Sequence, residues 1–248
     1  MRNSGYLVAI AIFGFCSHTF AAEAPPAGLI KLVANREAET VEERDNYAYR
    51  QTVRVGELND RGAEVGRYYE ARDIIFSPAH ERSERIVTAP TQNLKNLKLT
   101  EEDFQDLRDI QPFVLQKYLL AQYDVKFRGD ENINGVDCWV LQVRPKQILQ
   151  SQRFFEGLIW ASKKDYSVVR TEGQAVPQLL STSQENLFPR FTTIRKQVNG
   201  NFWFPAVTHA DDTLSFRSGP QRIKLVIRYT NYQKFGSSTT ITFDDPKE

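Results

Sequence analysis

The stretch Arg153–Thr171, RFFEGLIWASKKDYSVVRT, holds two apolar runs separated by the charged tetrad Lys163–Tyr166. In the first run, alternate positions place large apolar groups on both faces of a β-strand. A strand of this kind needs cover on both sides. With no catalytic motif nearby, the stretch favours a protein that encloses an apolar ligand over one that performs chemistry.

Hairpin signals surround this stretch on both sides. Asn134-Gly135 is the strongest short turn signal in the chain, and Asn59–Gly62 and Asn199–Asn201 are also turn-forming. The runs between such turns predict an antiparallel meander of about ten or eleven strands. A flat sheet of that size would leave an apolar face uncovered, so we expect a mainly β fold with a strongly curved sheet or an unclosed barrel.

Two segments have helical spacing instead. Residues 28–44 predict an amphipathic helix, and Thr100 followed by three acidic residues marks the start of a second one. Pro112 should divide the second segment into two pieces that end near Leu120. We expect these helices to cover the open concave side, and Pro90 to end a short strand over residues 85–89.

The first residues have the pattern of a secretory signal peptide, with Arg2 before an apolar run at Tyr6–Phe15 and small residues at Ala21 and Ala22. We therefore expect residues 1–22 to be removed and residues 23–248 to form one domain in the periplasm. Only Cys138 then remains, and a single cysteine forms no internal disulfide.

Charge and motifs exclude several classes of function. The 32 basic and 31 acidic residues nearly cancel, so no global field favours nucleic acid. The sequence lacks a Gly-x-Ser-x-Gly, a His-Glu-x-x-His and a phosphate-binding glycine loop. We expect no enzyme activity, no metal, no cofactor and a monomer. The alternative is a small-molecule hydrolase that uses His209 and Asp211, which share one strand face.

Several phrases of the sequence are similar to bacterial outer-membrane lipoprotein-sorting proteins, the LolA/LolB-like superfamily that includes the sensor RseB. These phrases are Phe155–Trp160, Lys164–Tyr166, Val168–Arg170, Glu185–Pro189, Asn201–Pro205 and Ala210–Asp212. The resemblance spans most of the chain and implies an unclosed β-barrel with helices over a hydrophobic cavity that receives acyl chains. It also implies lipid or lipoprotein ligands and membrane-bound donor or acceptor proteins. An RseB-like sensor of envelope stress is the second role that it allows.

The resemblance and the strand patterns together predict where a ligand lies. An arginine that holds the helical lid shut is also implied, for which Arg50, Arg54 and Arg72 are candidates. The lid candidates are Phe104, Leu107, Ile110 and Phe113. The candidates for the cavity wall are Tyr47, Tyr49, Tyr69, Trp139, Leu141, Phe155, Ile159, Phe202, Phe204, Leu225 and Ile227.

Overall fold

The computed structural model describes residues 24–77, 79–109, 114–115, 117–148, 153–180 and 185–235. The predicted signal peptide lies outside these residues. No helix in the described ranges is long and apolar enough to cross a membrane. The elements are α1 Leu29–Arg44, β1 Tyr47–Leu58, β2 Glu64–Phe76, β3 Arg82–Gln92, α2 Glu101–Asp109, the 3₁₀ helix η1 Lys117–Gln122, β4 Tyr123–Ile133, β5 Val136–Pro145, β6 Phe154–Ser162, β7 Val168–Val176, β8 Leu179–Leu180, β9 Glu185–Asn186, β10 Phe191–Val198, β11 Phe202–Phe216 and β12 Gly219–Lys234.

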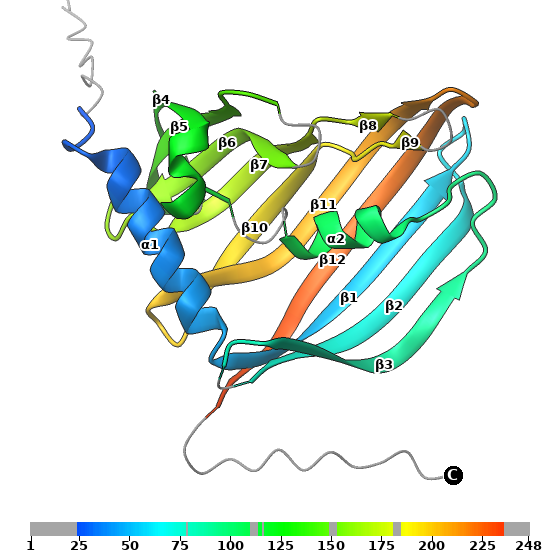
Figure 1. Ribbon diagram of the computed structural model, residues 1–248, viewed down its shortest axis with the longest axis horizontal. Coiled ribbons are helices and arrows are strands. Elements are labelled where there is room, and N and C mark those ends of the chain that lie inside the picture. The colour runs from blue at the N-terminus through cyan, green and yellow to red at the C-terminus, as the bar shows by residue number, and fades with distance from the viewer. Residues whose placement is uncertain are drawn as a thin grey trace, which may run out of the picture.

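Ten of these strands form one antiparallel sheet in the order β3-β2-β1-β12-β11-β10-β7-β6-β5-β4, and β8 pairs only with β9. The edge strands β3 and β4 are not paired with each other, so the sheet is unclosed. Both α1 and α2 lie on the same side of it (Figure 1). The predicted fold class, an unclosed barrel of about ten strands with helices over the concave side, is confirmed.

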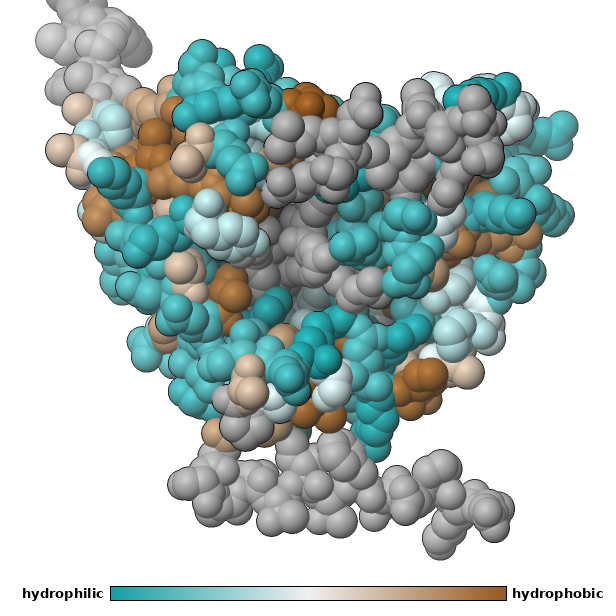
Figure 2. Space-filling view, viewed as in Figure 1, coloured by the Kyte–Doolittle hydropathy of each residue, from teal (hydrophilic) through white to brown (hydrophobic). Residues whose placement is uncertain are grey.

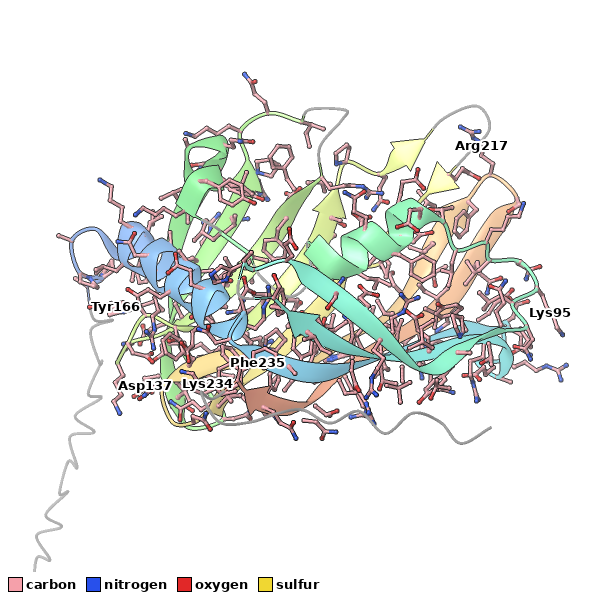
Figure 3. All side chains as sticks on the ribbon, turned by 60° about the horizontal axis from the view of Figure 1, so that its bottom comes forward. Lys95, Asp137, Tyr166, Arg217, Lys234 and Phe235 are labelled. Carbon is pink, nitrogen blue, oxygen red and sulfur yellow. The ribbon has the colours of Figure 1, made fainter. Side chains whose placement is uncertain are left out.

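The strand order places a long connection across the open face. The chain leaves the sheet at the β3 edge and re-enters it at the β4 edge, and α2 and η1 lie on the way. Figure 3 shows the long axis of the sheet, with Lys95 and Arg217 at one end and Tyr166 and Lys234 at the other. We call residues 93–122 the crossover. Because it joins opposite edges, it has to pass over the concave face.

One predicted strand end is wrong. β3 continues through Pro90 to Gln92, because an edge strand can place the missing N–H of proline away from its neighbour. β11 runs from Phe202 to Phe216, so His209 and Asp211 both lie within one strand.

Strand β6 is buried on both faces, as its sequence requires. Phe155 and Ile159 belong to the main core on the concave side. On the convex side, Trp160 packs with Cys138, Val140 and Val169 in a second cluster. The Trp160 Nε1–H donates a hydrogen bond of 2.8 Å to Glu131, and Arg170 lies over the indole ring at 4.7 Å. Among the described residues, side chains of neighbouring strands cover this face.

Phe155 lies flat against the sheet because its neighbours are glycines. Gly157 and Gly173 face each other across β6 and β7. A Cβ atom at Gly157 would lie 2.8 Å from Cζ of Phe155, and one at Gly173 would lie 2.7 Å from it. Backbone atoms lie nearer still, with the carbonyl oxygen of Glu172 nearest to the Cβ position at Gly157 and that of Glu156 nearest to the one at Gly173. The close approach of the two strands and the ring of Phe155 together leave no space for a side chain at either glycine.

A buried ion pair attaches α1 to the sheet. The Glu37 carboxylate accepts two hydrogen bonds of 2.6 Å from the guanidinium of Arg195 in β10, and both side chains are completely buried. The same carboxylate accepts a hydrogen bond of 3.0 Å from the backbone N–H of Val114. Glu37 therefore joins α1, the sheet and the crossover at one point.

We expect Glu37→Gln to lower the free energy of unfolding by about 3–5 kcal/mol, because it leaves the Arg195 charge buried without a charged partner. Urea denaturation monitored by circular dichroism measures this. The matched control is Glu39→Gln in the same helix. The side chain of Glu39, which pairs with Arg36, is 59% exposed, so this substitution should change the free energy of unfolding by less than about 1 kcal/mol. Equal effects of the two substitutions would contradict the assignment.

Candidate functional site

Helix α2 begins with a reciprocal cap. The backbone N–H and the hydroxyl of Thr100 donate hydrogen bonds to the Asp103 carboxylate at 2.7 and 3.0 Å, and the Asp103 N–H donates to the Thr100 hydroxyl at 3.3 Å. Burial raises the pKa of Asp103 and outweighs the hydrogen bonds from Thr100 that lower it. The cap predicted at Thr100 is therefore present, and it fixes the residue at which the helix begins over the concave face.

The apolar side of α2 faces the sheet. The ring of Phe104 packs against Tyr68 of β2 with centroids 5.6 Å apart, and Leu107 is buried in the main core. Both residues are lid candidates from the sequence. The other two lid candidates, Ile110 and Phe113, lie outside the described residues.

A largely buried ion pair holds the far side of α2. Nη2 of Arg153, directly before β6, lies 3.3 Å from the Asp106 carboxylate, and the two side chains are 10% and 5% exposed. Burial lowers the pKa of Arg153 more than the charges of Asp106 and Asp103 raise it. Arg153 was not among the predicted lid arginines.

A cavity of about 530 Å³ lies between α2 and the strands β1, β2 and β3. Its volume is within the range of small-molecule sites. Helix α2 contributes Phe104 and Leu107 and also the carboxylate of Glu101, whereas the strands contribute most of the charged and amide groups. We call this the mixed cavity. It is lined by Gln51, Val53, Tyr68, Glu70, Arg72, Glu84, Pro90, Gln92, Leu99, Glu101, Phe104 and Leu107.

A second, much smaller cavity of about 50 Å³ lies on another side of α2. Leu99 and Leu107 line both cavities, so they separate the two spaces. We call this one the apolar cavity, because its other walls include Val55, Leu97, Leu187, Phe188, Leu214, Phe216, Ile223 and Leu225. It has room for one or two water molecules, and an alkyl chain enters only if Leu107 and Leu99 move apart.

The charged floor of the mixed cavity is a network on β2 and β3. Arg72 donates from Nε to Glu70 at 2.9 Å and from Nη1 to Glu84 at 2.6 Å, and Arg82 also donates to Glu84. Glu70 is almost completely buried. Of the predicted lid arginines, Arg72 is thus in the cavity, whereas Arg50 pairs with Asp73 and Arg54 pairs with Glu64.

Most of the residues predicted for the cavity wall are buried in the core. Among the predicted wall residues, Leu225 lines one of these two cavities, and the rest do not. Tyr47, Phe204 and Tyr232 pack edge-on or tilted with ring centroids 5.0–6.5 Å apart, and Phe202 stacks on Phe204. The buried side chains that fill the concave side in this way are Tyr47, Tyr49, Trp139, Leu141, Phe155, Ile159, Phe204 and Ile227.

Tyr69 faces the other side of the sheet. It pairs with Arg54 in β1, whereas its neighbour Tyr68 pairs with the inward-facing Val55. Residues directly opposite each other in an antiparallel pair share a face. The prediction that Tyr69 lines the cavity is therefore wrong by one residue, and the inward tyrosine is Tyr68.

The hydrolase alternative finds no support in the geometry. His209 is exposed, and Asp211 on the same face lies 3.0 Å from Arg222 and 3.4 Å from Lys224. Burial raises the pKa of Asp211, but the hydrogen bonds from Arg222 and Lys224 outweigh it and hold this pKa below its ordinary value. Neither His209 nor Asp211 lines the mixed or the apolar cavity.

Cys138 is buried in the convex cluster, and burial, with the nearby charge of Asp137, raises the pKa of its thiol to about 11. It therefore packs as an apolar residue, as its strand pattern predicts. Within the ranges that the structure describes, no three His, Cys, Asp or Glu residues gather as metal ligands.

Sequence reasoning missed Glu37, Arg195, Glu70 and Arg153. A signal existed for Glu37, because it occupies the buried stripe of α1 that also contains Leu29 and Val33 at helical spacing. For the other three, no local pattern shows that their partners come from distant strands.

Comparison with known proteins found no matching family model and no matching curated protein. Among solved structures, a DUF1329 family protein from Desulfovibrio piger is 14% identical, covers 85% of this chain and 95% of its own, and has a TM-score of 0.41. A LolA superfamily protein from Nitrosomonas europaea is 14% identical over 82% of this chain and 94% of its own, with a TM-score of 0.35. A chain of the Pseudomonas aeruginosa MucA/MucB complex is 12% identical over 85% of this chain and 100% of its own, with a TM-score of 0.28.

Arg153→Met should loosen α2, because it leaves the Asp106 carboxylate without its cation in a buried position. We expect the backbone amides of α2 to exchange with deuterium about tenfold faster or more, while those of β6 and β10 change little. Hydrogen–deuterium exchange with mass spectrometry measures both regions. The control is Arg144→Met, because Arg144, which pairs with Glu156, is 59% exposed. This substitution should leave amide exchange in α2 unchanged. Unchanged exchange in the Arg153 variant would show that the pair does not hold the helix.

Proposed function

We propose that this chain is a periplasmic, non-enzymatic carrier that binds lipids or the acyl chains of lipoproteins beneath α2, for the sorting of outer-membrane lipoproteins. The observation that carries the proposal is the pair of cavities that share Leu99 and Leu107 on the concave face. Binding sites for small ligands are concave and combine apolar walls with a few polar groups. Here the apolar cavity supplies the apolar walls, and the mixed cavity supplies charged and amide groups beside Val53, Leu99, Phe104 and Leu107.

The position of α2 over the cavities supports a ligand that enters by displacing this helix. A short helix of the crossover, Glu101–Asp109, covers the cavities, and its inner side contributes Phe104 and Leu107. When these residues move outward, the apolar cavity and the mixed cavity join into one space. An alkyl chain would then cover the apolar surface that Phe104 and Leu107 leave exposed. The hydrophobic effect therefore favours replacement of these two side chains by the alkyl chain.

The face that carries the helices fits this role. It is mainly hydrophilic, with small hydrophobic patches over the region of α1 and η1 and near the edge of the sheet (Figure 2). The apolar groups that we propose for contact with a lipid line the two cavities beside α2. This arrangement suits a protein that keeps an apolar ligand away from water.

Native mass spectrometry of the protein purified from its own periplasm is the direct test. We expect a fraction of the protein to carry a lipid or lipopeptide of discrete mass. An unliganded mass, together with no increase in fluorescence of the uncharged apolar probe N-phenyl-1-naphthylamine, would overturn the proposal.

Leu107→Asp should weaken uptake of that probe by about tenfold or more, because it places a charge between the two cavities. Phe104→Asp, at a half-buried position of the same wall, should act in the same direction with less effect on folding. The control is Leu158→Asp, at a half-buried position beside the convex cluster, which should leave uptake unchanged in a folded protein. Fluorescence titration gives the affinities, and circular dichroism verifies the fold of each variant.

A further inference from the structure

The charged groups of the mixed cavity are predominantly carboxylates. Glu70, Glu84 and Glu101 line it together with a single basic residue, Arg72. They come from β2, β3 and the first turn of α2. Val53, Leu99, Phe104 and Leu107 are apolar residues of the same lining, and Leu99 and Leu107 also line the apolar cavity.

Arg72 is already engaged on both sides. It hydrogen-bonds Glu70 at 2.9 Å and Glu84 at 2.6 Å, and its Nη2 lies 2.8 Å from Glu70. A ligand with a carboxylate, phosphate or sulfate head would have to displace one of these carboxylates to reach the guanidinium. It would also lie close to both of them, where like charges repel in a space with limited access to water.

A head group that donates hydrogen bonds is attracted by the same carboxylates that repel an anionic head group. Each glutamate has two carboxylate oxygens with room for several hydrogen bonds. Arg72, together with Arg82 at Glu84, uses only part of this capacity. The side chain of Glu70 is 7% exposed and that of Glu84 is 21% exposed, so both are shielded from water but Glu84 is open on one side. An ammonium group placed there gains charge-assisted hydrogen bonds.

We infer that the cavity selects an amphiphile whose alkyl chain ends in an ammonium or a similarly donor-rich head, and that Glu70 and Glu84 determine this selectivity. The inference rests on the proposed function, because it assigns the head-group class of the same ligand. The alkyl chain lies beneath Phe104 and Leu107, and the head lies against the β2 and β3 carboxylates. Free fatty acids and anionic detergents are the disfavoured class.

Three ligands with one decyl chain test this directly: decylammonium, decyl maltoside and decanoate. Each is added below its micelle concentration to the protein loaded with N-phenyl-1-naphthylamine, and the loss of fluorescence gives its affinity. We expect decylammonium to displace the probe at a concentration about tenfold lower, or more, than decanoate, with the uncharged maltoside between them.

The variant Glu84→Gln should reduce this difference between decylammonium and decanoate to about threefold or less, with little effect on binding of the maltoside. Glu70→Gln should act in the same direction. If this variant does not fold, because Glu70 is the more buried of the two, the Glu84→Gln variant alone tests the selectivity. The control is Glu64→Gln, which removes a carboxylate that pairs with Arg54 and Arg67 and does not line the mixed cavity.

The outcomes separate the two proposals. Probe uptake with equal displacement by the three ligands, or with decanoate preferred, overturns the head-group selectivity and leaves the carrier function standing. A selectivity that persists unchanged in both glutamine variants removes Glu70 and Glu84 from the site. Absence of probe uptake, and of any binding of the decyl ligands by calorimetry, overturns the carrier function and the selectivity with it.

Discussion

The buried ion pair between Glu37 and Arg195 determines how the helices lie on the sheet. Two charges without access to water are stable only when they are paired. Here one carboxylate accepts hydrogen bonds from both terminal nitrogens of the guanidinium and from the backbone N–H of Val114. Shifting α1 along the sheet by one turn would separate the charges at a large cost. The pair therefore fixes the position of α1, and through Val114 it also fixes one point of the crossover.

The remaining cover of the concave face follows from that point. The crossover joins the two edges of an unclosed sheet and carries α2 over the open side (Figure 1), and it is attached to the rest of the molecule at Asp106 and at Val114. Under α1 the concave side is filled by interlocking aromatic and aliphatic side chains. Under α2 it is not, and both cavities lie there. The fold thus combines a packed half that supplies stability with a hollow half that is available for a ligand.

Patterns within a single element were sufficient for much of the architecture. The Asn134-Gly135 turn, the alternation on β1 and the capped start of α2 are local signals, and the structure has a hairpin, a strand and a helix at those places. The failures are also local in origin. Tyr68 and Tyr69 are adjacent, both aromatic, and equally suited to a strand, so only the register against β1 shows which of them faces inward. Pro90 ends many strands, but at an edge it is tolerated.

The sequence by itself determined a signal-peptide pattern, an antiparallel meander with two helical segments, and an apolar content too large for one face of a sheet, because these depend on periodicity and turn chemistry. Only the tertiary structure decided which apolar residues are core and which surround a cavity. It also decided that Glu37 meets Arg195, that Asp106 meets Arg153, and that Glu70, Arg72 and Glu84 form one cavity floor. The physical reason is that a cavity, or a buried charge pair, depends on side chains from distant segments, whose separation is set by strand order and register and is not encoded in any local spacing.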